Sequence, residues 1–427
     1  MSEASFTFYR ETRFKEVELN GRKARIPEEW EVVELGEVAR IRKKKSVRDI
    51  AEVAVIPMEK VPQDNELFAE FEIKAIEDVK SSTYCEAGDL LLAKITPSFE
   101  NGKQGIVPFN VPNGFALATT EVYPIVPSEN LDVFFLFYIL KDKRFRKILE
   151  VRMTGTTGRQ RVQKTDLLKL QIPLPPLEEQ KKIAEILRSI DEAIQAVDES
   201  IARLERLKKG TMERLLTRGI NHTRFKTVEL NGRKVEIPEE WDVVELGEVA
   251  ERRNESVNPA NMGNIPFVGL EHIEPGNIRL SQWGNSSEVK SSKSKFYPGD
   301  ILYGKLRPYL DKAVIADFEG ICSTDIIVIK AKEDKTIPEY LIWVIHSKEF
   351  IEYAKKTMKG VNHPRTSWKS IKQFQIPLPP LEEQKKIAEI LRTIDEAIEA
   401  KRAKKEKLER MKKAVMEKLL TGEVRVR

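Results

Sequence analysis

The chain has 427 residues, a length that favours about three compact units. It carries 73 Lys and Arg against 68 Asp and Glu, and 41% of its residues are apolar, so it is neither a polycation nor a membrane protein. Its most apolar run, Val133 to Leu140, has eight residues, well short of the ~18–20 that span a bilayer. The N-terminal residues lack the layout of a signal peptide, and two cysteines suit a reducing compartment, so we expect a cytoplasmic protein. Four scattered histidines offer no zinc-ligand spacing, and we expect no metal or other cofactor in this chain.

The chain is a tandem duplication. Residues 14–39 recur as residues 225–250 with 22 of 26 positions identical, and residues 171–194 recur as residues 375–398 with 23 of 24 identical. Between these blocks the copies diverge, and only short islands stay similar. The islands are Gly88–Lys94, which parallels Gly299–Lys305, and Thr119–Glu121, which parallels Ser323–Asp325. One scaffold with two variable faces suits a protein that reads two unlike things with one architecture.

The divergent regions, roughly residues 20–165 and 231–369, are predicted to be mixed α/β. Short apolar or alternating runs among Gly, Pro, Asn and Ser indicate strands. Examples of these runs are Val53–Pro57, Leu90–Ala93 and Ile326–Ile329. Each region also holds one predicted helix, Leu131 to Arg152 in the first and Glu339 to Lys359 in the second.

A long helix follows the first divergent region. The acids of Leu177-Glu-Glu-Gln come just after a Pro-rich stretch and suit a first helical turn. Apolar residues then alternate at spacings of four and three, which is the pattern of a coiled-coil seam. Gly219 is a stop signal after about forty residues, or roughly 60 Å of helix. The first seam consists of Ile183, Leu187, Ile190, Ile194, Val197, Ile201 and Leu204.

The second long helix repeats this seam only in part. Its apolar positions are Ile387, Leu391, Ile394 and Ile398. Lys401, Lys405 and Lys412 follow on the extrapolated seam, so the far half is expected to be wetter or slightly rotated, and Gly422 ends the helix. Nine basic residues against three acids between Lys401 and Lys418 indicate a solvated helix face, with contact to phosphate or to an acidic partner as the alternative.

The order of domain, long helix, domain and long helix resembles the DNA specificity subunit of type I restriction–modification enzymes. The motif Ile-Pro-Glu-Glu-Trp opens each domain, and Ile-Pro-Leu-Pro-Pro-Leu-Glu-Glu-Gln-Lys-Lys-Ile-Ala-Glu-Ile-Leu opens each long helix. The resemblance covers the chain from about Phe14 to Leu420. Both motifs are specific because each occurs twice, in order, around divergent inserts.

The resemblance implies a fold of class α/β, with two similar target-recognition domains separated by two long helices that form an antiparallel coiled coil with an internal pseudo-two-fold repeat. The expected boundaries are 1–170 for the first recognition domain, 171–219 for the central long helix, 220–374 for the second recognition domain and 375–427 for the C-terminal long helix. Each domain is expected to read half of a split, asymmetric site in double-stranded DNA. The implied partners are two modification subunits, which carry S-adenosylmethionine and methylate adenine, and restriction subunits with a motor and a nuclease.

The sequence shows no catalytic motif of its own. It lacks the Asn-Pro-Pro-Tyr/Phe tetrapeptide of adenine methyltransferases and the Gly-x-x-x-x-Gly-Lys-Ser/Thr phosphate loop. Asp89 with Lys94, and Asp300 with Lys305, could mimic a nuclease site. Each aspartate follows a glycine, however, and a tight turn into a strand is the better interpretation. We therefore expect a subunit that is not an enzyme.

Candidate DNA contacts lie in loops after the shared islands. Lys and Arg neutralise phosphates, whereas guanidinium, amide and hydroxyl groups reach base edges. The glycine-containing loops 154–161 and 359–365 suit close approach of backbone to phosphate, with a solvated surface loop as the alternative. The candidates are Lys94, Thr96, Ser98, Asn101, Lys103, Gln104, Thr156, Arg159, Gln160 and Arg161 in the first domain, and Lys305, Arg307, Tyr309, Lys312, Asn362, His363 and Arg365 in the second.

Aromatic residues of the repeated blocks are predicted to pack in the core. Trp30 and Trp241 lie where sequence-specific readout would not be shared, so burial is favoured over base stacking. The long helices are expected to run antiparallel, with the seam of Ile183 packed against the seam of Ile387, and to act as a ruler for the gap in the DNA site. The rival hypothesis from another class is a coiled-coil adaptor with two protein-binding modules and no DNA readout. A self-contained restriction enzyme is a further rival, disfavoured by the missing motifs.

Overall fold

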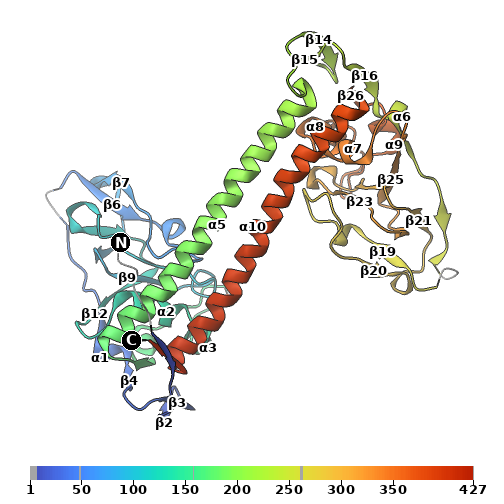
Figure 1. The fold of residues 1–427 in the computed structure, drawn as a ribbon. Helices are drawn as coiled ribbons and strands as arrows, with labels where there is room; N and C mark the ends of the chain where they lie inside the picture. Colours follow the sequence, from blue (N-terminus) through green and yellow to red (C-terminus); the bar gives the residue numbers. More distant parts are fainter. Residues whose placement is uncertain (1–6, 48–49, 157, 260–262, 427) are drawn as a thin grey trace. The chain divides into compact units, whose positions relative to one another are not determined.

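The computed structural model describes residues 7–47, 50–156, 158–259 and 263–426. The chain divides into two compact units, called unit 1 (residues 1–199 and 402–427) and unit 2 (residues 200–401). Each unit therefore holds one α/β domain and about half of each long helix (Figure 1). Residues 1–6, whose sequence lacks the layout of a signal peptide, lie outside the described residues.

Unit 1 is built from two four-stranded sheets and small sheets beside them. Among the described residues the first sheet has the order β10-β9-β12-β5 and the second the order β7-β6-β11-β8. The strands are β5 (Ala39–Ile41), β6 (Glu52–Ile56), β7 (Glu72–Ala75), β8 (Thr83–Glu86), β9 (Leu90–Ala93), β10 (Gln104–Ile106), β11 (Phe115–Ala118) and β12 (Val122–Pro127). All pairs are antiparallel except β6 with β11, which is parallel. The predicted strands at residues 53–57 and 90–93 are confirmed.

Unit 2 repeats this plan with different lengths. Its sheets have the orders β17-β25-β22-β23 and β18-β21-β24-β19-β20 within the described residues. The strands are β17 (Ala250–Arg252), β18 (Ser256–Val257), β19 (Pro266–Val268), β20 (Gly284–Asn285), β21 (Lys293–Phe296), β22 (Ile301–Gly304), β23 (Ala313–Ile315), β24 (Gly320–Cys322) and β25 (Ile326–Ala331). The predicted strand at residues 326–329 is confirmed as part of β25.

The first repeated block forms a hairpin in each unit. In unit 1 it joins β2 (Phe14–Leu19) to β3 (Arg22–Pro27), and in unit 2 β14 (Phe225–Leu230) to β15 (Arg233–Pro238). The Asn-Gly turn between the strands has positive φ at both residues, 53° and 77° in unit 1, which is the geometry of a two-residue hairpin turn. The repeated Asn-Gly pair is therefore required by the turn.

The asparagine of that turn also fastens the hairpin to the strand that precedes the long helix. The Nδ2 of Asn20 donates to the carbonyl of Gln171 at 2.8 Å, and its Oδ1 accepts from the Gln171 N–H at 2.9 Å. Asn231 and Gln375 form the same two bonds in unit 2, at 2.8 and 2.9 Å. The two glutamines open β13 (Gln171–Leu174) and β26 (Gln375–Leu378), which pair with β4 (Glu31–Glu34) and β16 (Asp242–Glu245).

Each predicted helix between the sheets and the long helices is broken in two. The prediction of one helix over residues 131–152 is wrong, because α2 (Val133–Lys141) ends and α3 (Lys143–Val151) begins around Asp142. The backbone of Asp142 is extended (ψ 126°), and its carboxylate accepts the N–H of Arg144, so the residue caps the next helix. The prediction over residues 339–359 is wrong in the same way. There α7 (Pro338–Ile345) is followed by α8 (Lys348–Lys356), whose N-cap is Ser347.

The short elements complete the two domains. They are α1 (Leu35–Val38), α4 (Lys164–Leu168), η1 (Met58–Lys60), η2 (Ile76–Asp78) and η3 (Pro112–Gly114) in unit 1, and α6 (Leu246–Val249), α9 (Trp368–Ile371), η5 (Leu270–His272), η6 (Ser286–Glu288) and η7 (Pro308–Leu310) in unit 2. No helix within the described part of the chain is long and apolar enough to cross a membrane.

The long helices α5 (Leu177–Arg218) and α10 (Leu381–Thr421) run antiparallel where each unit holds them. In unit 1, Asp191 and Asp198 of α5 meet Lys412 and Lys405 of α10 at 2.5 and 2.7 Å. In unit 2, Lys208 of α5 meets Asp395 of α10 at 2.5 Å. Numbers that rise along one helix fall along the other, so the predicted antiparallel pair is confirmed, together with the fold class.

The predicted seam is mostly buried, but its partners differ from the prediction. Buried seam residues are Ile183, Leu187, Ile190, Ile194, Val197, Ile387, Leu391 and Ile398, whereas Ile201, Leu204 and Ile394 are half-buried. The packing of the Ile183 seam against the Ile387 seam is wrong. Ile183 belongs to the core of unit 1 with Leu419 and Leu420, and Ile387 to the core of unit 2 with Leu215 and Leu216. An antiparallel pair places the start of one helix beside the end of the other.

The sequence suggests a wet or slightly rotated second half of this seam, but Lys405 and Lys412 face α5 and form ion pairs with it. Lys412 is only 8% exposed and forms its ion pair with the buried Asp191, which also accepts the Tyr138 hydroxyl at 2.8 Å. Burial raises the pKa of Asp191 despite the opposing charge of Lys412. The seam is therefore ion-paired in its second half.

A tryptophan and a glutamate join each domain to its long helix. The indole Nε1 of Trp30 donates to Glu179 at 3.0 Å, and that of Trp241 donates to Glu383 at 2.9 Å. Both tryptophans are fully buried, which confirms the predicted core packing. One of the two acids predicted for each first helical turn, Glu179 or Glu383, thus joins the long helix to its domain.

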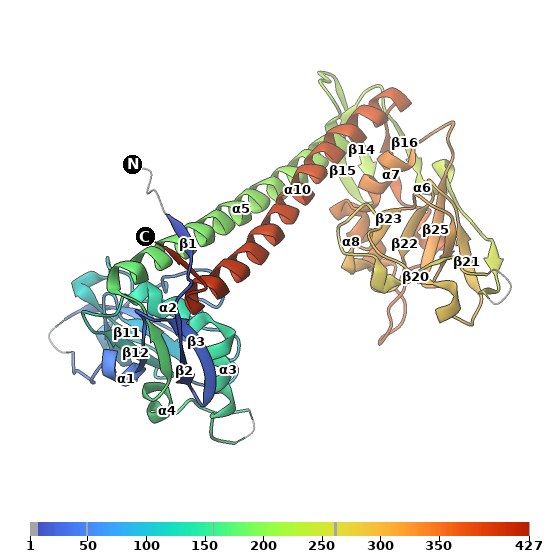
Figure 2. The ribbon, with the colours of Figure 1, turned by 60° about the horizontal axis from the view of Figure 1, so that its bottom comes forward.

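The third partner of this junction differs between the units. In unit 1 it is Arg425, whose Nη2 lies 2.7 Å from Glu179 and whose Nη1 lies 2.8 Å from Glu11. Arg425 sits on β27 (Val424–Val426), which pairs antiparallel with β1 (Phe8–Arg10), so the first and last strands lie side by side in Figure 2. In unit 2 the third partner is His222, 2.8 Å from Glu383 and just past the end of α5.

Candidate nucleic-acid interface

Two loops of unit 1 are tied together at their bases. The β9–β10 loop (residues 94–103) and the α3–α4 loop (residues 152–163) form an antiparallel bridge between Ile95 and Arg161. Thr96 N donates to Gln160 O at 3.0 Å, and Val162 N donates to Lys94 O at 2.8 Å. The α3–α4 loop is closed on itself by two backbone bonds of 3.0 and 2.8 Å between Thr154 and Arg161. Two divergent segments are thus held at a fixed place.

Unit 2 repeats this arrangement with other residues. The β22–β23 loop (residues 305–312) and the α8–α9 loop (residues 357–367) bridge at Leu306 and Arg365. Arg307 N donates to Pro364 O at 2.9 Å, and Lys359 and Arg365 close the α8–α9 loop through bonds of 2.9 and 3.0 Å. The backbone frame of the two loops is therefore shared even though their sequences diverge.

A bidentate ion pair fixes the arginine at the base of each frame. In unit 1 the guanidinium of Arg161 meets both carboxylate oxygens of Glu121, at 2.8 and 3.2 Å. In unit 2 Arg365 meets both oxygens of Asp325, at 2.8 and 3.0 Å. The hydrogen bonds from these arginines hold the pKa of Glu121 and of Asp325 below their usual values, so both acids are ionised at neutral pH.

A lysine completes each group. Lys94 lies beside Glu121 with its Nζ 4.8 Å from the Tyr123 ring centre, and the Nζ of Lys305 lies 4.0 Å from Asp325. Burial lowers the pKa of Lys94 and of Lys305, and the neighbouring acid opposes that shift. We call Lys94, Glu121 and Arg161 the clamp of unit 1, and Lys305, Asp325 and Arg365 the clamp of unit 2. With all groups charged, each clamp carries a net charge of +1 next to exposed backbone.

The loop tips carry the exposed and divergent side chains. Thr156, Arg159 and Gln160 are exposed in unit 1, and Arg307, Tyr309, Asn362 and His363 are exposed in unit 2. Thr157, within the predicted loop 154–161, lies outside the described residues. Among the described residues no hydrogen bond or ion pair holds the Arg159 side chain, in contrast to Arg161. The tips therefore offer unlike donors and acceptors on like frames.

Three candidates named from the sequence serve the fold instead. Lys103 donates to the carbonyls of Met58 and Val61 at 2.7 and 3.2 Å, and Lys312 donates to the carbonyl of Leu270 at 2.6 Å. Gln104 is fully buried in β10 and donates to the Phe137 carbonyl at 2.7 Å, so its expected DNA contact is wrong. The cause in each case is burial against a distant segment, which a local pattern of polar residues does not reveal.

The remaining candidates lie on the surface of the same loops. Thr96 is half-buried and its hydroxyl donates to Glu100 at 2.7 Å, Ser98 is half-buried, and Asn101 is exposed. The aspartates once weighed as part of a nuclease site are buried and bind arginines, Asp89 with Arg42 and Asp300 with Arg253, at 2.7 Å in both pairs. Gly88 and Gly299 have φ of 85° and 86°, so the prediction of a tight turn is confirmed.

The acids of the clamps were missed as site residues, although a signal existed. Glu121 and Asp325 were noted only as similar islands. They are separated by 204 residues, and so are Arg161 and Arg365 (325 − 121 and 365 − 161). An equal offset between two pairs of opposite charges is the signal that could have paired them. Lys141 and His346, described below, were missed too because each lies at the end of an apolar helix.

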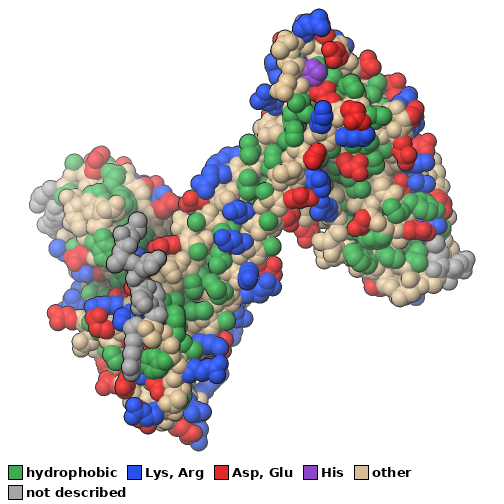
Figure 3. Space-filling model, viewed as in Figure 1, with side chains coloured by type: hydrophobic (Ala, Val, Ile, Leu, Met, Phe, Trp, Pro, Cys, Tyr) green, Lys and Arg blue, Asp and Glu red, His purple; other side chains and the backbone are tan. Residues whose placement is uncertain are grey.

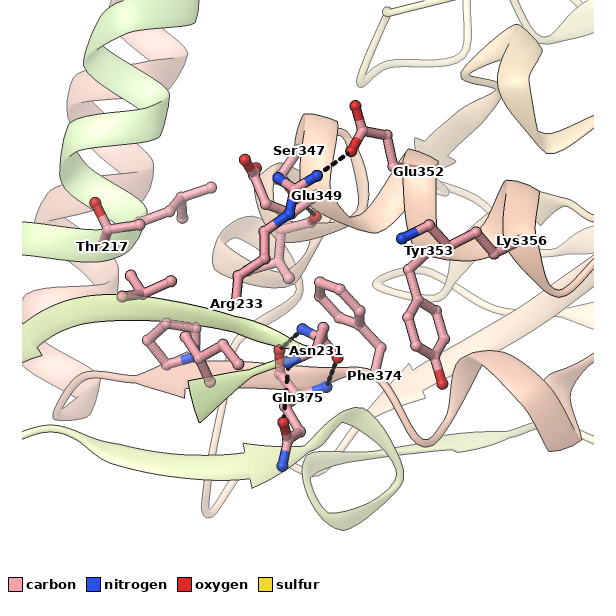
Figure 4. A pocket seen from close by; sticks show the side chains of 15 residues that line it. Thr217, Asn231, Arg233, Ser347, Glu349, Glu352, Tyr353, Lys356, Phe374 and Gln375 are labelled. Atoms are coloured by element: carbon pink, nitrogen blue, oxygen red, sulfur yellow. Dashed lines mark hydrogen bonds and ion pairs between the residues drawn. The ribbon is translucent and has the colours of Figure 1, made fainter. Parts of the chain in front are cut away.

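A cavity of about 90 Å³ in unit 2 lies away from these loops. It sits between the β14–β15 hairpin and α8, with Arg233 bonded to Glu352 at 2.8 Å and the bonds between Asn231 and Gln375 nearby (Figure 4). Its apolar lining includes Leu216, Leu230, Val235, Val344, Phe374 and Pro377. These residues come from α5, the β14–β15 hairpin, α7 and the β26 segment, and the candidate DNA contacts do not line the cavity.

Charges of both signs cover the surface. On the face drawn in Figure 3, Lys and Arg recur along the long helices, and acidic and basic side chains are interspersed over both α/β domains. This mixture agrees with the small net charge of +5. Any binding of a polyanion therefore depends on local groups such as the clamps rather than on a general positive field.

The duplicated frame, with clamped loops whose tips diverge, defines a class of protein built from two similar units with unlike surfaces. The family described as type I restriction modification DNA specificity domain matches residues 27–206 and 238–410. The MjaVIII specificity subunit of a type I restriction enzyme from Methanocaldococcus jannaschii is 31% identical, with 98% of each chain covered. The EcoDI specificity subunit from Escherichia coli is 27% identical over 59% of this chain and 60% of that protein.

Solved structures agree on the fold. The type I system S subunit from M. genitalium has a TM-score of 0.57 at 13% identity, with 91% of this chain and 96% of that chain covered. A chain from a structure on complex assembly and conformational transition of a type I system has a TM-score of 0.56 at 18% identity and covers 93% of this chain and 99% of its own. The chain belongs to the family of type I restriction–modification DNA specificity subunits.

Proposed function

We propose that this chain is the DNA-recognition subunit of a type I restriction–modification complex and that each unit reads one half of a split, asymmetric site in double-stranded DNA. The observation that carries the proposal is the contrast within each loop frame. Both units hold the same Lys, acid and Arg clamp, whereas the loop tips differ in every exposed group. A shared frame with unlike tips is what reading two different half-sites requires.

The groups divide into two kinds of contact. Lys94, Arg161, Lys305 and Arg365 contact phosphates in our proposal, because their charge repeats in both units and so carries no sequence information. Thr96, Asn101, Thr156, Arg159, Gln160, Arg307, Tyr309, Asn362 and His363 are the candidates for base edges. Arginine bonded in two places to guanine, and asparagine or glutamine to adenine, are the pairings such side chains make in the major groove.

The long helices set the gap between the half-sites. At 1.5 Å per residue the 42 residues of α5 make a rod of roughly 60 Å. Two domains that face the same side of the duplex need half-site centres about one turn apart, ~34–36 Å. The continuity of α5 and α10 through both units supports their role as the ruler.

Catalysis resides in partner subunits in this proposal. Two modification subunits methylate DNA at the recognised site, and restriction subunits cleave it, while this chain uses no cofactor. Both cysteines, Cys85 and Cys322, are free and buried, which suits the reducing cytoplasm as the place of action. The rival adaptor without DNA readout finds no support in the family match.

Sequencing of methylated bases in a host that expresses the chain with its modification subunits tests the proposal. We expect one motif with two unlike half-sites and a fixed gap. A symmetric, continuous motif would contradict it. Binding of the complex to duplexes at roughly 50 to 200 mM salt distinguishes a DNA reader from the adaptor. A DNA reader loses affinity steeply as salt rises, whereas an adaptor does not bind the duplex.

A further inference from the structure

In each unit a basic side chain at the end of a short helix, α2 or α7, reaches the β9–β10 loop or the β22–β23 loop. Lys141 is the last residue of α2, and His346 directly follows α7. They occupy the same place in the repeat, because each lies four residues before the buried phenylalanine of the next helix, Phe145 or Phe350. The two residues differ in chemistry although their positions are equivalent.

In unit 2 both ring nitrogens of His346 face hydrogen-bond acceptors. Nδ1 lies 2.7 Å from Oδ1 of Asp311, and Nε2 lies 3.0 Å from the carbonyl of Ala313. The side chain is buried, with 7% of the residue exposed. The ring therefore ties the Asp311 side chain and the Ala313 backbone to the end of α7.

The residue that His346 holds is conformationally unusual. Asp311 has φ of 53°, and Arg307 at the other end of η7 has φ of 49°. Apart from glycine, asparagine and aspartate are the residues that visit this left-handed region, and arginine rarely does, so the loop needs outside contacts to keep its shape. The His346 bond to the Asp311 side chain and the bond from Gly276 N to Asp311 O at 2.9 Å supply them.

In unit 1 the equivalent loop is held by a lysine that binds backbone carbonyls. The Nζ of Lys141 donates to the carbonyl of Gly102 at 2.9 Å and to that of Gln63 at 2.6 Å. Gly102 precedes Lys103 as Asp311 precedes Lys312, and its φ of 84° is one that glycine adopts without strain. A glycine held by a lysine in unit 1 thus replaces an aspartate held by a histidine in unit 2.

We propose that Lys141 and His346 are positioning residues that hold the β9–β10 and β22–β23 loops in the shape that reads DNA. The inference rests on the proposed function of these loops. It deepens that function, because a buried group behind each loop, rather than a group that touches DNA, then decides how well each half-site is read.

Lys141 can hold its loop with or without its charge. Burial lowers the pKa of Lys141 to about 7, and a neutral amine keeps two N–H donors for the two carbonyls. Reading of the half-site of unit 1 should therefore change little with pH.

Other charged groups surround each residue. Around His346 they are Asp311, Tyr303 with its buried hydroxyl, Lys312, Arg307 at the start of η7, and Lys348 and Glu349 in the first turn of α8, which packs on η7. Around Lys141 they are Arg146, Lys412, Asp64 and Asp191. Asp311 is the charged group that makes direct contact with His346.

Nuclear magnetic resonance tests the geometry without DNA. The chain has four histidines, so ¹⁵N-histidine labelling gives few signals. We expect a protected ring N–H signal from His346, which His346→Gln removes, and none from the exposed His363. A His346 ring without any protected N–H would overturn the inference.

Binding of the complex to duplexes altered in one half-site tests the consequence. His346→Gln should reduce discrimination at the half-site of unit 2 by about tenfold and leave the other half unchanged, because one buried charged bond is lost. Lys141→Met should reduce discrimination at the half-site of unit 1 and leave that of unit 2 unchanged. His346→Lys, which copies unit 1, should retain the discrimination that His346→Gln loses.

The failures are distinguishable. If the unchanged complex discriminates and His346→Gln alters neither half-site, or alters both equally, the positioning role is overturned while the proposed function stands. If the unchanged complex shows no discrimination, the proposed function fails and the positioning role fails with it. Circular dichroism of each variant confirms that it folds, and His346→Lys provides the second variant if His346→Gln does not.

Discussion

Unit 1 and unit 2 share their frame and differ where the frame ends. The Trp30 and Glu179 junction of unit 1 recurs as Trp241 and Glu383 in unit 2, with nitrogen–oxygen distances of 3.0 and 2.9 Å. The hairpin asparagines and the clamps recur as closely. Differences begin in the loops and in the groups directly behind them. The tryptophan, glutamate and hairpin asparagine positions thus keep their residue types, whereas positions in the loops and directly behind them do not.

The third partner at the junction shows how much change the frame accepts. Unit 1 uses Arg425 from the C-terminal strand, and unit 2 uses His222, which directly follows α5 in the chain. The nitrogen lies 2.7 Å from Glu179 in unit 1 and 2.8 Å from the equivalent Glu383 in unit 2. The frame therefore preserves a donor at a point in space rather than a particular residue, and the following predictions test where that equivalence fails.

The largest difference between the units should appear when the junction donor is removed. Arg425→Ala leaves the buried Glu179 and the half-buried Glu11 without their cation and should destabilise unit 1 by about 3–5 kcal/mol, since a buried charge without its partner is costly. The matched change His222→Ala removes one bond to Glu383 and should cost unit 2 about 1 kcal/mol. Hydrogen exchange with increasing urea reports the two units separately. Equal losses would show that the donors are interchangeable in energy as well as in geometry.

The loss in Arg425→Ala should shrink in acid. The backbone N–H of Arg13 and then the Arg425 side chain lower the pKa of Glu11 to about 2 from its usual 4.5. A depressed carboxyl pKa gives stability that is present above the unfolded value and is lost as pH falls toward the folded value. The difference between Arg425→Ala and the unchanged chain should therefore narrow between pH 5 and pH 2, as roughly bounded by these two pKa values.

A smaller difference concerns a buried arginine that only unit 1 has. Arg146 is 5% exposed, and none of its three side-chain nitrogens meets an acceptor among the described residues. Burial lowers the pKa of Arg146 to about 10, and its guanidinium lies 4.5 Å from the Phe99 ring centre. Ile351 occupies the equivalent place in unit 2.

Arg146→Ile should therefore stabilise unit 1 by about 1–3 kcal/mol, because it removes an unsatisfied buried group. The control Arg144→Ile makes the same change of charge at a side chain that is paired with Asp142 and half-exposed. It should not stabilise unit 1. Urea unfolding of both variants provides the measurement. A loss of stability in Arg146→Ile would mean that the arginine has a partner such as ordered water.

Removing a free arginine should affect one base pair, whereas removing a clamped one should not. Arg159→Ala should cost ~1–3 kcal/mol of discrimination at one position if it reads guanine, or lower the salt slope by about one if it contacts phosphate. Arg365→Ala also releases Asp325, so it should weaken binding to all sequences alike. Binding to duplexes with single substitutions separates these results. Unchanged affinity for Arg159→Ala at every salt concentration would refute both of its roles.

The smallest expected change is in spacing alone. Four residues inserted after Glu199 in α5, with four more after Lys401 in α10, add about 6 Å to the helix pair while the ion pairs on either side keep their register. The gap in the methylated motif should grow by one or two base pairs, at roughly 3.4 Å per step, and both half-sites should stay the same. A changed half-site with an unchanged gap would show that the helices are not the ruler.

Much of the frame was predictable because its signals are local. The repeated blocks, the seam spacing and the glycines after each long helix predicted α5 and α10, and Gly219 and Gly422 do adopt positive φ of 62° and 73°. The helix break at Asp142 was missed because the apolar pattern continues across it and only the cap interrupts the backbone.

Contacts between segments that lie far apart in the chain could not be predicted from the sequence. The pairing of β27 with β1 joins the two ends of the chain, and no local pattern marks it. Lys412 was placed on a wet seam because its partner, Asp191, lies on the other helix. For the same reason Lys103 was expected at DNA, whereas two backbone carbonyls from a distant turn bind it.

The central claim, that each unit reads its own half-site, is tested most directly by making the two units alike. Residues 246–374 are replaced by residues 35–170, so that both frames carry the loops of unit 1 between the same repeated blocks. Methylated bases are then sequenced in a host that also expresses the modification subunits. The account predicts a symmetric motif, with the half-site of unit 1 present twice as an inverted repeat and the gap preserved. An unchanged asymmetric motif from the folded, assembled complex would contradict it.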